Sequence, residues 1–243
     1  MKEVFIPTQN FQKLQALCSD LLKTQLGLEM AKVIGPAGRG KSFAADKVFT
    51  MMGSDVVYVR FIETMTHVGL VRELAFALGG SRPRSTQLSI DKIRSELKTR
   101  RKVLMVDECD RMTLRHLNTL RDIHDICKTP VVMIGEDALE QKLLAERRLG
   151  SRVSAGLRFD PISPGEVAVY YKMALDQAIT PKQAERLARH SDGDFRMVVN
   201  DALNIERRMK ASGIGQIADE LIGEVCGNGG GNGEARQDFR KSV

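Results

Sequence analysis

The densest chemical signal in the sequence is one eight-residue stretch, Gly35-Pro36-Ala37-Gly38-Arg39-Gly40-Lys41-Ser42. It fits the spacing GxxxxGK[S/T], in which glycines let backbone N–H groups converge on phosphate oxygens. In that spacing the lysine, Lys41, reaches the β- and γ-phosphates of a nucleotide, and the hydroxyl of Ser42 is a ligand for Mg²⁺. An apolar run ending at Val33-Ile34 precedes the loop, and a helical segment follows it and points its positive amino end at the same anion. We therefore predict that residues 35–42 bind the phosphates of ATP together with Mg²⁺.

Two adjacent carboxylates, Asp107 and Glu108, directly follow the apolar run Val103–Val106. At the end of such a strand we expect Asp107 to orient Mg²⁺ and Glu108 to act as the base, or the positioning group, for the attacking water. The alternative is an ordinary acidic strand end. An adjacent Asp-Glu pair also disfavours kinases and GTPases, which generally lack a glutamate at this position.

A third acidic position, Glu136, follows Gly135 at the end of the apolar run Pro130–Ile134. We expect this strand to lie between the strand before the phosphate loop and the strand that ends at Asp107. Its end then faces the γ-phosphate, which makes Glu136 a candidate nucleotide sensor. A role for Glu136 or Asp137 at the start of the next helix is equally compatible with the sequence.

Alternating strands and helices must position these residues. Strands are expected at Val33-Ile34, 56–59, 103–106, 130–134 and 157–159, and helices at 11–25, 41–52, 67–78, 87–98, 114–127 and 138–148. This alternation predicts an α/β fold with right-handed crossovers and a parallel sheet flanked by helices. After Pro161 only helical segments follow, at 163–177, 181–190, 195–211 and 217–225. We predict a nucleotide-binding domain over residues 1–161, a small helical lid domain over 162–225 and a disordered glycine-rich tail over 226–243.

Composition excludes several classes. The chain has 243 residues, of which 42% are hydrophobic and 28% charged, and no run reaches the ~18 apolar residues of a membrane span. No signal peptide is evident, so we expect a cytoplasmic protein without a membrane partner. The four cysteines form no CxxC pair, so we expect reduced, buried thiols. His116 and His124 are not at metal-ligand spacing, so we expect a packing or surface role for them. The net charge of +6 is compatible with a polyanion partner and does not establish one.

These motifs together resemble the AAA+ superfamily of ATPases. Gly193-Asp194-Phe195-Arg196 is similar to the sensor 2 motif of the family's lid, in which the arginine, here Arg196, reaches ATP. Ser151-Arg152 resembles the box that supplies an arginine finger to a neighbouring subunit, so the resemblance implies that Arg152 acts in trans, with Arg147 and Arg148 as competitors. A surface position on a helix is the alternative for Arg196, and a solvated charge is the alternative for Arg152.

Within AAA+, the chain resembles the transposition helper ATPases of the phage Mu B, TnsC and IstB type. The likeness rests on GPAGRGKS, DECDRM, PVVMIGE and GSRV, and it covers roughly residues 3–225. It implies ATP-dependent assembly into a filament or ring on double-stranded DNA, delivery of target DNA to a transposase, and stimulation of ATP hydrolysis by that transposase. A phage-encoded protein of this kind would work in the host cytoplasm. The phage B proteins carry an amino-terminal helix-turn-helix domain, for which we expect no room before this ATPase core.

Candidate DNA contacts lie between the second strand and Asp107. Phosphate contacts from Lys, Arg and hydroxyl side chains dominate binding without sequence preference. The best candidates are Arg82 and Arg84, followed by Thr66 and Lys98. An ordinary solvated surface is the alternative for each. The absence of Trp and the presence of only three Tyr favour duplex backbone contacts over base stacking.

Three other functions share some of these features. A helicase loader or replication initiator has the same ATPase core and is distinguished poorly by sequence. A superfamily 2 helicase is suggested by Asp107–Asp110 but needs a second RecA-like domain, for which the chain is too short. A scaffold that binds ATP without hydrolysing it is disfavoured by the intact Lys41, Asp107 and Glu108.

Overall fold

The computed structural model describes residues 1–24 and 29–227. Their contacts divide into two compact units, one formed by Gln9–Phe159 and the other by Met1–Thr8 together with the residues from Asp160 on. Each unit is described by itself.

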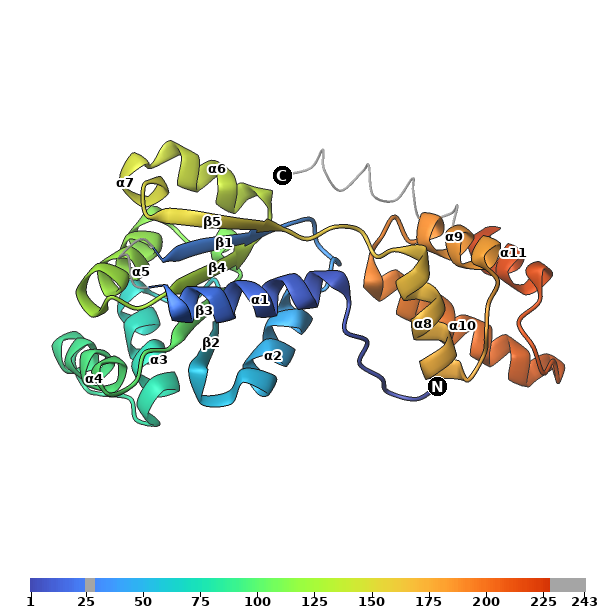
Figure 1. The fold of residues 1–243 in the computed structure, drawn as a ribbon, viewed down its shortest axis with the longest axis horizontal. Helices are drawn as coiled ribbons and strands as arrows, with labels where there is room; N and C mark the ends of the chain where they lie inside the picture. The colour runs from blue at the N-terminus through green and yellow to red at the C-terminus, as the bar shows by residue number, and fades with distance from the viewer. Residues whose placement is uncertain (25–28, 228–243) are drawn as a thin grey trace. The chain divides into compact units, whose positions relative to one another are not determined.

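The first unit is built on a five-stranded parallel sheet with the strand order β2-β3-β4-β1-β5 (Figure 1). The strands are β1 (Met30–Ile34), β2 (Val56–Arg60), β3 (Val103–Asp107), β4 (Val131–Gly135) and β5 (Val153–Arg158). The predicted parallel α/β fold is confirmed, and β4 lies between β1 and β3 as expected. Strand β5 begins four residues before the predicted Leu157. Its exposed positions include Ser154 and Gly156, so this edge strand lacks the apolar run that marks the buried strands.

Helices cover both faces of the sheet (Figure 1). They are α1 (Gln9–Lys23), α2 (Lys41–Met52), α3 (His67–Gly79), α4 (Thr86–Thr99), α5 (Leu114–Cys127), α6 (Asp137–Ala145) and α7 (Arg147–Gly150), with short 3-10 turns η1 (Gly53–Asp55) and η2 (Cys109–Arg111). One face, with Val59, Val106 and Met133, forms a core with α3 to α7. On the other face, Met105 of β3 contacts Cys18 of α1 at 3.8 Å between sulfurs.

One predicted helix is divided in two. The segment 138–148 was expected as a single helix, but Glu146 adopts extended backbone angles between α6 and α7. The break brings Leu149 of α7 into the core, where it is fully buried. The burial of that leucine outweighs the helical preference of the residues around the break.

The second unit consists of helices α8 (Pro164–Leu175), α9 (Pro181–His190), α10 (Phe195–Ser212) and α11 (Asp219–Gly227). Capping boxes start α8 at Ser163 and α9 at Thr180, each followed by proline in the first turn. The predicted lid helices are present. Residues 226–227 end α11, whereas they were expected in the disordered tail, and the rest of that tail lies outside the described residues.

Residues 1–8 pack with the helical unit, although the sequence assigned them to the α/β domain. Ile6 belongs to the helical core, and the Lys2 amide donates to the carbonyl of Ala174 at 2.9 Å. The sequence did not indicate this because one buried isoleucine in an extended segment has no periodicity.

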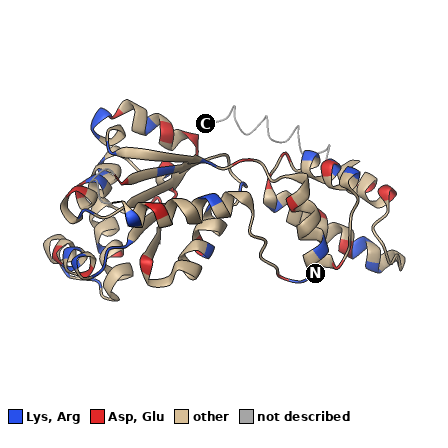
Figure 2. Cartoon of the chain, viewed as in Figure 1, with Lys and Arg blue, Asp and Glu red and all other residues tan. Residues whose placement is uncertain are grey.

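Charges of both signs are interspersed over the two units, as Figure 2 shows. Among the described residues, no helix has the length and apolar character needed to cross a bilayer. Cys18 and Cys109 are buried, and Cys127 and Cys226 are partly buried; all four are free thiols.

Candidate nucleotide site

The phosphate loop lies where its motif requires, between the end of β1 and the start of α2. Gly38 and Gly40 have φ angles of 79° and 80°, a left-handed conformation that glycine adopts without steric penalty. Gly35 is needed for close packing, because a Cβ there would lie 3.2 Å from the carbonyl oxygen of Phe159. The loop glycines are therefore demanded by backbone geometry as well as by phosphate chemistry.

Lys41 is buried at the centre of the site, with 9% of its surface exposed. Its Nζ donates to the carbonyls of Gly35 at 2.6 Å and Pro36 at 2.8 Å, which leaves one ammonium hydrogen without a partner among the described residues. Burial lowers the pKa of Lys41, and nearby carboxylates oppose that shift, with Glu136 the strongest and Asp107, Asp110 and Glu108 behind it. The sheet thus gathers the phosphate loop, the end of β3 and the end of β4 around one ammonium group.

Asp107 ends β3 and is 2% exposed. Its Oδ2 accepts a hydrogen bond from the Tyr58 hydroxyl at 2.9 Å, and its Oδ1 accepts one from the Glu108 amide at 2.8 Å. Burial, followed by the Asp107 charge, raises the pKa of Tyr58, so this phenol stays protonated and remains a donor. Two fixed donors hold the carboxylate in one orientation and leave each oxygen a further lone pair.

Glu108 is clamped between two arginines. Its Oε1 lies 2.8 Å from Nη2 of Arg60 at the end of β2, and its Oε2 lies 3.0 Å from Nε of Arg111 in η2. The glutamate side chain is 19% exposed, whereas the two arginines are 56% and 55% exposed. Hydrogen bonding to Glu108 is also the main reason why the pKa of Arg60 is raised. Each carboxylate oxygen keeps a further lone pair, so the two ion pairs fix where the carboxylate points but leave it able to accept a proton.

Glu136 is exposed and follows β4, where its amide donates to Oδ1 of Asp110 at 3.1 Å. Gly135 allows this contact, because a Cβ there would lie 2.7 Å from the same oxygen. Lys142 of α6 donates to the carbonyls of Asp110 and Met112 and so ties α6 to the turn after Glu108. Both predicted alternatives for Glu136 fit this geometry, since it flanks the start of α6 and its charge acts on Lys41.

The residues present fit a nucleotide with Mg²⁺. Within the described ranges, no group of three or more His, Cys, Asp and Glu side chains is arranged to hold a metal ion. Mg²⁺ in phosphate sites takes only one or two protein groups and completes its shell with phosphate oxygens and water. Ser42 lies in the first turn of α2, and Asp107 keeps unused lone pairs, which is the donor set that such an ion needs.

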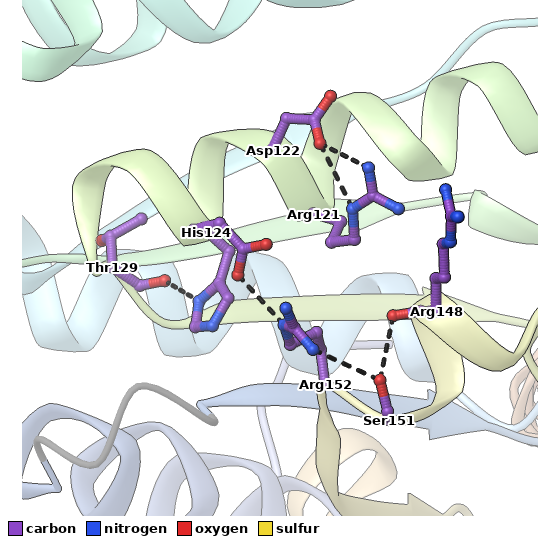
Figure 3. A network of polar contacts seen from close by, with 8 residues as sticks. Arg121, Asp122, His124, Thr129, Arg148, Ser151 and Arg152 are labelled. Atoms are coloured by element: carbon purple, nitrogen blue, oxygen red, sulfur yellow. Dashed lines mark hydrogen bonds and ion pairs between the residues drawn. The ribbon is translucent and has the colours of Figure 1, made fainter.

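Arg152 and the phosphate loop lie at opposite ends of the parallel strands. Arg152 directly precedes β5, whose first residue pairs with Met30 at the start of the parallel strand β1, whereas the phosphate loop follows the end of β1. The five residues of β1 separate the two ends of the strands by roughly 17 Å, which is beyond the reach of an arginine side chain. Its Nε pairs with Oδ1 of Asp125 in α5 at 3.1 Å, and its Nη1 donates to the Ser151 hydroxyl at 3.3 Å (Figure 3).

The two competing arginines differ from Arg152 in their contacts. The side chains of Arg147 and Arg148 are exposed and form no ion pair with any described residue, and Figure 3 shows Arg148 extended away from Arg152. Arg196 lies in the first turn of α10, in the helical unit, where its amide donates to the capping residue Asp194. Its predicted contact with ATP stays a prediction.

The four predicted DNA contacts do not form one cluster. Arg82 pairs with Glu73 at 2.8 Å and stacks over Phe76, while Arg84 is exposed and forms no ion pair with a described residue. Thr66 caps α3 by accepting from the Gly69 amide at 3.0 Å. Lys98 lies in the last turn of α4, roughly 20 Å along that helix from Arg84.

Sequence reasoning missed Tyr58, Arg60 and Arg111, which hold the two carboxylates in place. It also missed Asp110, which accepts a hydrogen bond from the Glu136 amide. Tyr58 and Arg60 lie on β2, beside Asp107 in the register of the sheet, which depends on the strand order. Asp110 and Arg111 were visible in the DECDRM segment, but nothing in their spacing showed which atoms they contact.

The strand order, the glycine loop and the helices after the sheet give the chain a P-loop AAA+ fold with carboxy-terminal helices. In agreement, residues 27–143 match the AAA domain family. A "Potential ATP-binding protein" of Staphylococcus aureus is 27% identical over 129 residues, which cover 49% of this chain and 48% of that protein. The "ORC1-type DNA replication protein 1" of Halobacterium salinarum is 24% identical over 215 residues, which cover 81% of this chain and 68% of that protein.

A solved structure with the same fold is the ORC1 protein of Aeropyrum pernix in complex with DNA. It superposes with a TM-score of 0.62 at 16% identity and covers 93% of this chain and 66% of that one. The chain thus spans about half the length of the staphylococcal relative, and about two thirds of the two ORC1 proteins.

Proposed function

We propose that the chain hydrolyses ATP at the site formed by residues 35–42, Asp107 and Glu108. The loop amides and Lys41 bind the phosphates, and Ser42 and Asp107 hold Mg²⁺, which neutralises charge on the transferred phosphoryl group. Glu108 orients the attacking water and accepts its proton, and it turns toward that water when its pairs with Arg60 and Arg111 loosen. Glu136 senses the γ-phosphate from the end of β4.

The observation that carries this proposal is the environment of Lys41. A buried ammonium among four acidic residues, on a loop of left-handed glycines that opens a helix, combines phosphate binding with groups that handle metal and water. An ATP-binding scaffold without turnover would not need Glu108 in this position.

We also propose that the protein works on DNA as an oligomer. Arg152 lies too far from its own phosphate loop, so the site is completed by a neighbouring copy, while Arg196 of the helical unit acts on the nucleotide of its own chain. An ORC1-type replication protein among the relatives, and the fold shared with an ORC1 protein bound to DNA, support a replication-initiator or helicase-loader type of ATPase. They favour this function over a transposition helper.

The transposition helper remains the second candidate. It is supported by the combined segments GPAGRGKS, DECDRM, PVVMIGE and GSRV. On this hypothesis the protein forms a filament or ring on duplex DNA, and a transposase stimulates its hydrolysis of ATP. Thr66, Arg82, Arg84 and Lys98 remain candidate DNA contacts under both functions.

Electron microscopy with a non-hydrolysable ATP analogue tests assembly and separates the two candidates. The purified chain is mixed with duplex DNA or with single-stranded DNA, with and without nucleotide. Regular nucleotide-dependent filaments on duplex DNA support the transposition helper, and assemblies confined to single strands support a loader. Dispersed monomers under all conditions contradict both.

A further inference from the structure

His116 makes two contacts that join separate elements near the site. It is the third residue of α5 and is 8% exposed. Its Nδ1 lies 3.3 Å from the amide of Thr113 and 2.8 Å from the Thr113 hydroxyl, which completes the cap of α5. Its Nε2 lies 3.1 Å from the carbonyl oxygen of Met65, in the loop between β2 and α3.

The partners determine which nitrogen carries the proton. The Thr113 amide only donates, so Nδ1 must keep its lone pair, and the Met65 carbonyl only accepts, so Nε2 must carry the hydrogen. His116 is therefore neutral and in one tautomer when both bonds are present. Burial lowers the pKa of His116, and the charges of His67 on α3 and Arg115 on α5 lower it further, against the opposing effect of the Met65 bond.

The other end of the same loop is attached to Asp107. The Phe61 amide donates to the Asp107 carbonyl at 3.0 Å, and the buried Phe61 ring meets the His116 ring edge-on, with centroids 5.0 Å apart. The loop is therefore held at both ends: Phe61 bonds to Asp107, and Met65 bonds to His116. Glu108 lies between Asp107 and His116 in the sequence. Between the anchors, Ile62, Glu63 and Thr64 are exposed.

We infer that His116 is a positioning residue that couples contact of the β2–α3 loop with DNA to ATP turnover at Asp107 and Glu108. The inference rests on the proposed function. The loop exposes the hydroxyls of Thr64 and Thr66 beside the carboxylate of Glu63, and Arg115, which adjoins His116 on α5, is also exposed. Hydroxyl and arginine side chains suit contact with a phosphate backbone. Movement of the loop would shift the Asp107 backbone through the Phe61 hydrogen bond and the start of α5 through the Met65 hydrogen bond.

The test compares ATP hydrolysis with and without duplex DNA in the wild-type chain and two variants. His116→Asn keeps an acceptor near the position of Nδ1 but removes the donor that reaches Met65. His116→Gln restores a donor near the position of Nε2. In His116→Asn we expect DNA-stimulated kcat to fall about tenfold, with little change in KM for ATP, because the loop loses its fixed position. His116→Gln should recover part of the stimulation.

His124→Gln, which moves the amide toward the position of Nε2 and removes the donor at Nδ1, is the matched control. His124 lies on the same helix, is fully buried, and pairs with the Thr129 carbonyl at 2.7 Å at the end of α5 away from the site. This variant should lose stability yet keep its stimulation by DNA. Equal loss of stimulation in His124→Gln and His116→Asn would overturn the inference, because general weakening of α5 would then explain both.

The outcomes also separate the inference from the proposed function. If DNA stimulates the wild type and His116→Asn equally, the inference is wrong and the proposed function stands. If the wild type shows no response to DNA, the DNA-dependent function fails and the inference fails with it. Should His116→Asn not fold, Phe61→Leu removes the ring contact at the same anchor. Lower stimulation in that variant supports the coupling, and wild-type stimulation overturns it.

Discussion

At the scale of single residues, the site is governed by how its charges are paired. Asp107 is held by two neutral donors, whereas Glu108 is held by two cations. Hydrogen bonds from neutral groups orient a carboxylate and leave its charge in place for a metal ion. Ion pairs with Arg60 and Arg111 fix where the Glu108 carboxylate points, so the resting arrangement restrains its movement toward the attacking water.

Removing both arginines should release that restraint. In an Arg60→Ala, Arg111→Ala double variant we expect ATP turnover without DNA to rise several-fold, measured as phosphate release. Both arginines are largely exposed, so each ion pair is expected to contribute only about 0–1 kcal/mol to stability. Arg100→Ala, which breaks an exposed pair with Asp55 at the far end of β2, is the control. A fall in turnover in the double variant would mean that the arginines assist hydrolysis and do not restrain it.

At the scale of elements, the ends of parallel strands carry the site, and small residues decide how closely they approach. Gly135→Ala places a methyl group 2.7 Å from Oδ1 and 2.9 Å from the backbone nitrogen of Asp110. We expect a loss of about 1–3 kcal/mol in the free energy of unfolding, measured by denaturant titration, because backbone must shift. Gly165→Ala is the control, since a Cβ there meets nothing within 4 Å. Equal stability of both variants would show that η2 and β4 adjust without strain.

The start of α5 should also make stability depend on pH. The pKa of His116 is lowered in the folded chain by burial and by His67 and Arg115. As pH falls below about 6.5, the unfolded chain binds a proton that the folded chain resists, so the free energy of unfolding decreases until the lowered pKa is reached. His116→Gln should reduce this slope in denaturant titrations between neutral and mildly acidic pH. An unchanged slope would assign the effect to other groups.

Elements with a strong periodic signal were predictable, and those defined by single contacts were not. Helices α2 and α5 begin and end at the predicted residues. Glycines flank the apolar pattern of α2, and Thr113 precedes that of α5, so the boundary residues and the apolar spacing predict the same limits. The start of β5, the break at Glu146 and the placement of residues 1–8 each depend on packing partners remote in sequence. The phosphate loop and the carboxylates were visible as motifs. The pairing of Glu108 with Arg60 required the register of β2 against β3.

At the scale of the whole molecule, one copy does not contain a complete site if Arg152 acts in trans. A mixture of Lys41→Ala and Arg152→Ala should then recover activity that neither variant has alone. In a one-to-one mixture we expect about a quarter of wild-type turnover, because only one of four neighbour combinations joins an intact loop to an intact arginine.

Asp125→Ala is the control for the mixture, since it removes the partner of Arg152 and leaves the guanidinium. If Arg152 only braces α7, Asp125→Ala should lose as much activity as Arg152→Ala. If Arg152 serves a neighbour, Asp125→Ala should retain most of it. Absence of any recovery in the mixture would contradict a shared site.

The central claim is that the site around Lys41 hydrolyses ATP through Glu108. Glu108→Gln tests it most directly, by measuring ATP binding and phosphate release in the same preparation. The amide keeps the shape of the side chain but cannot accept the proton of the attacking water, so release should fall by about 10²–10⁴-fold. ATP affinity should stay within a few-fold of wild type, because Lys41 and the loop are unchanged. Wild-type rates of phosphate release in this variant would contradict the account.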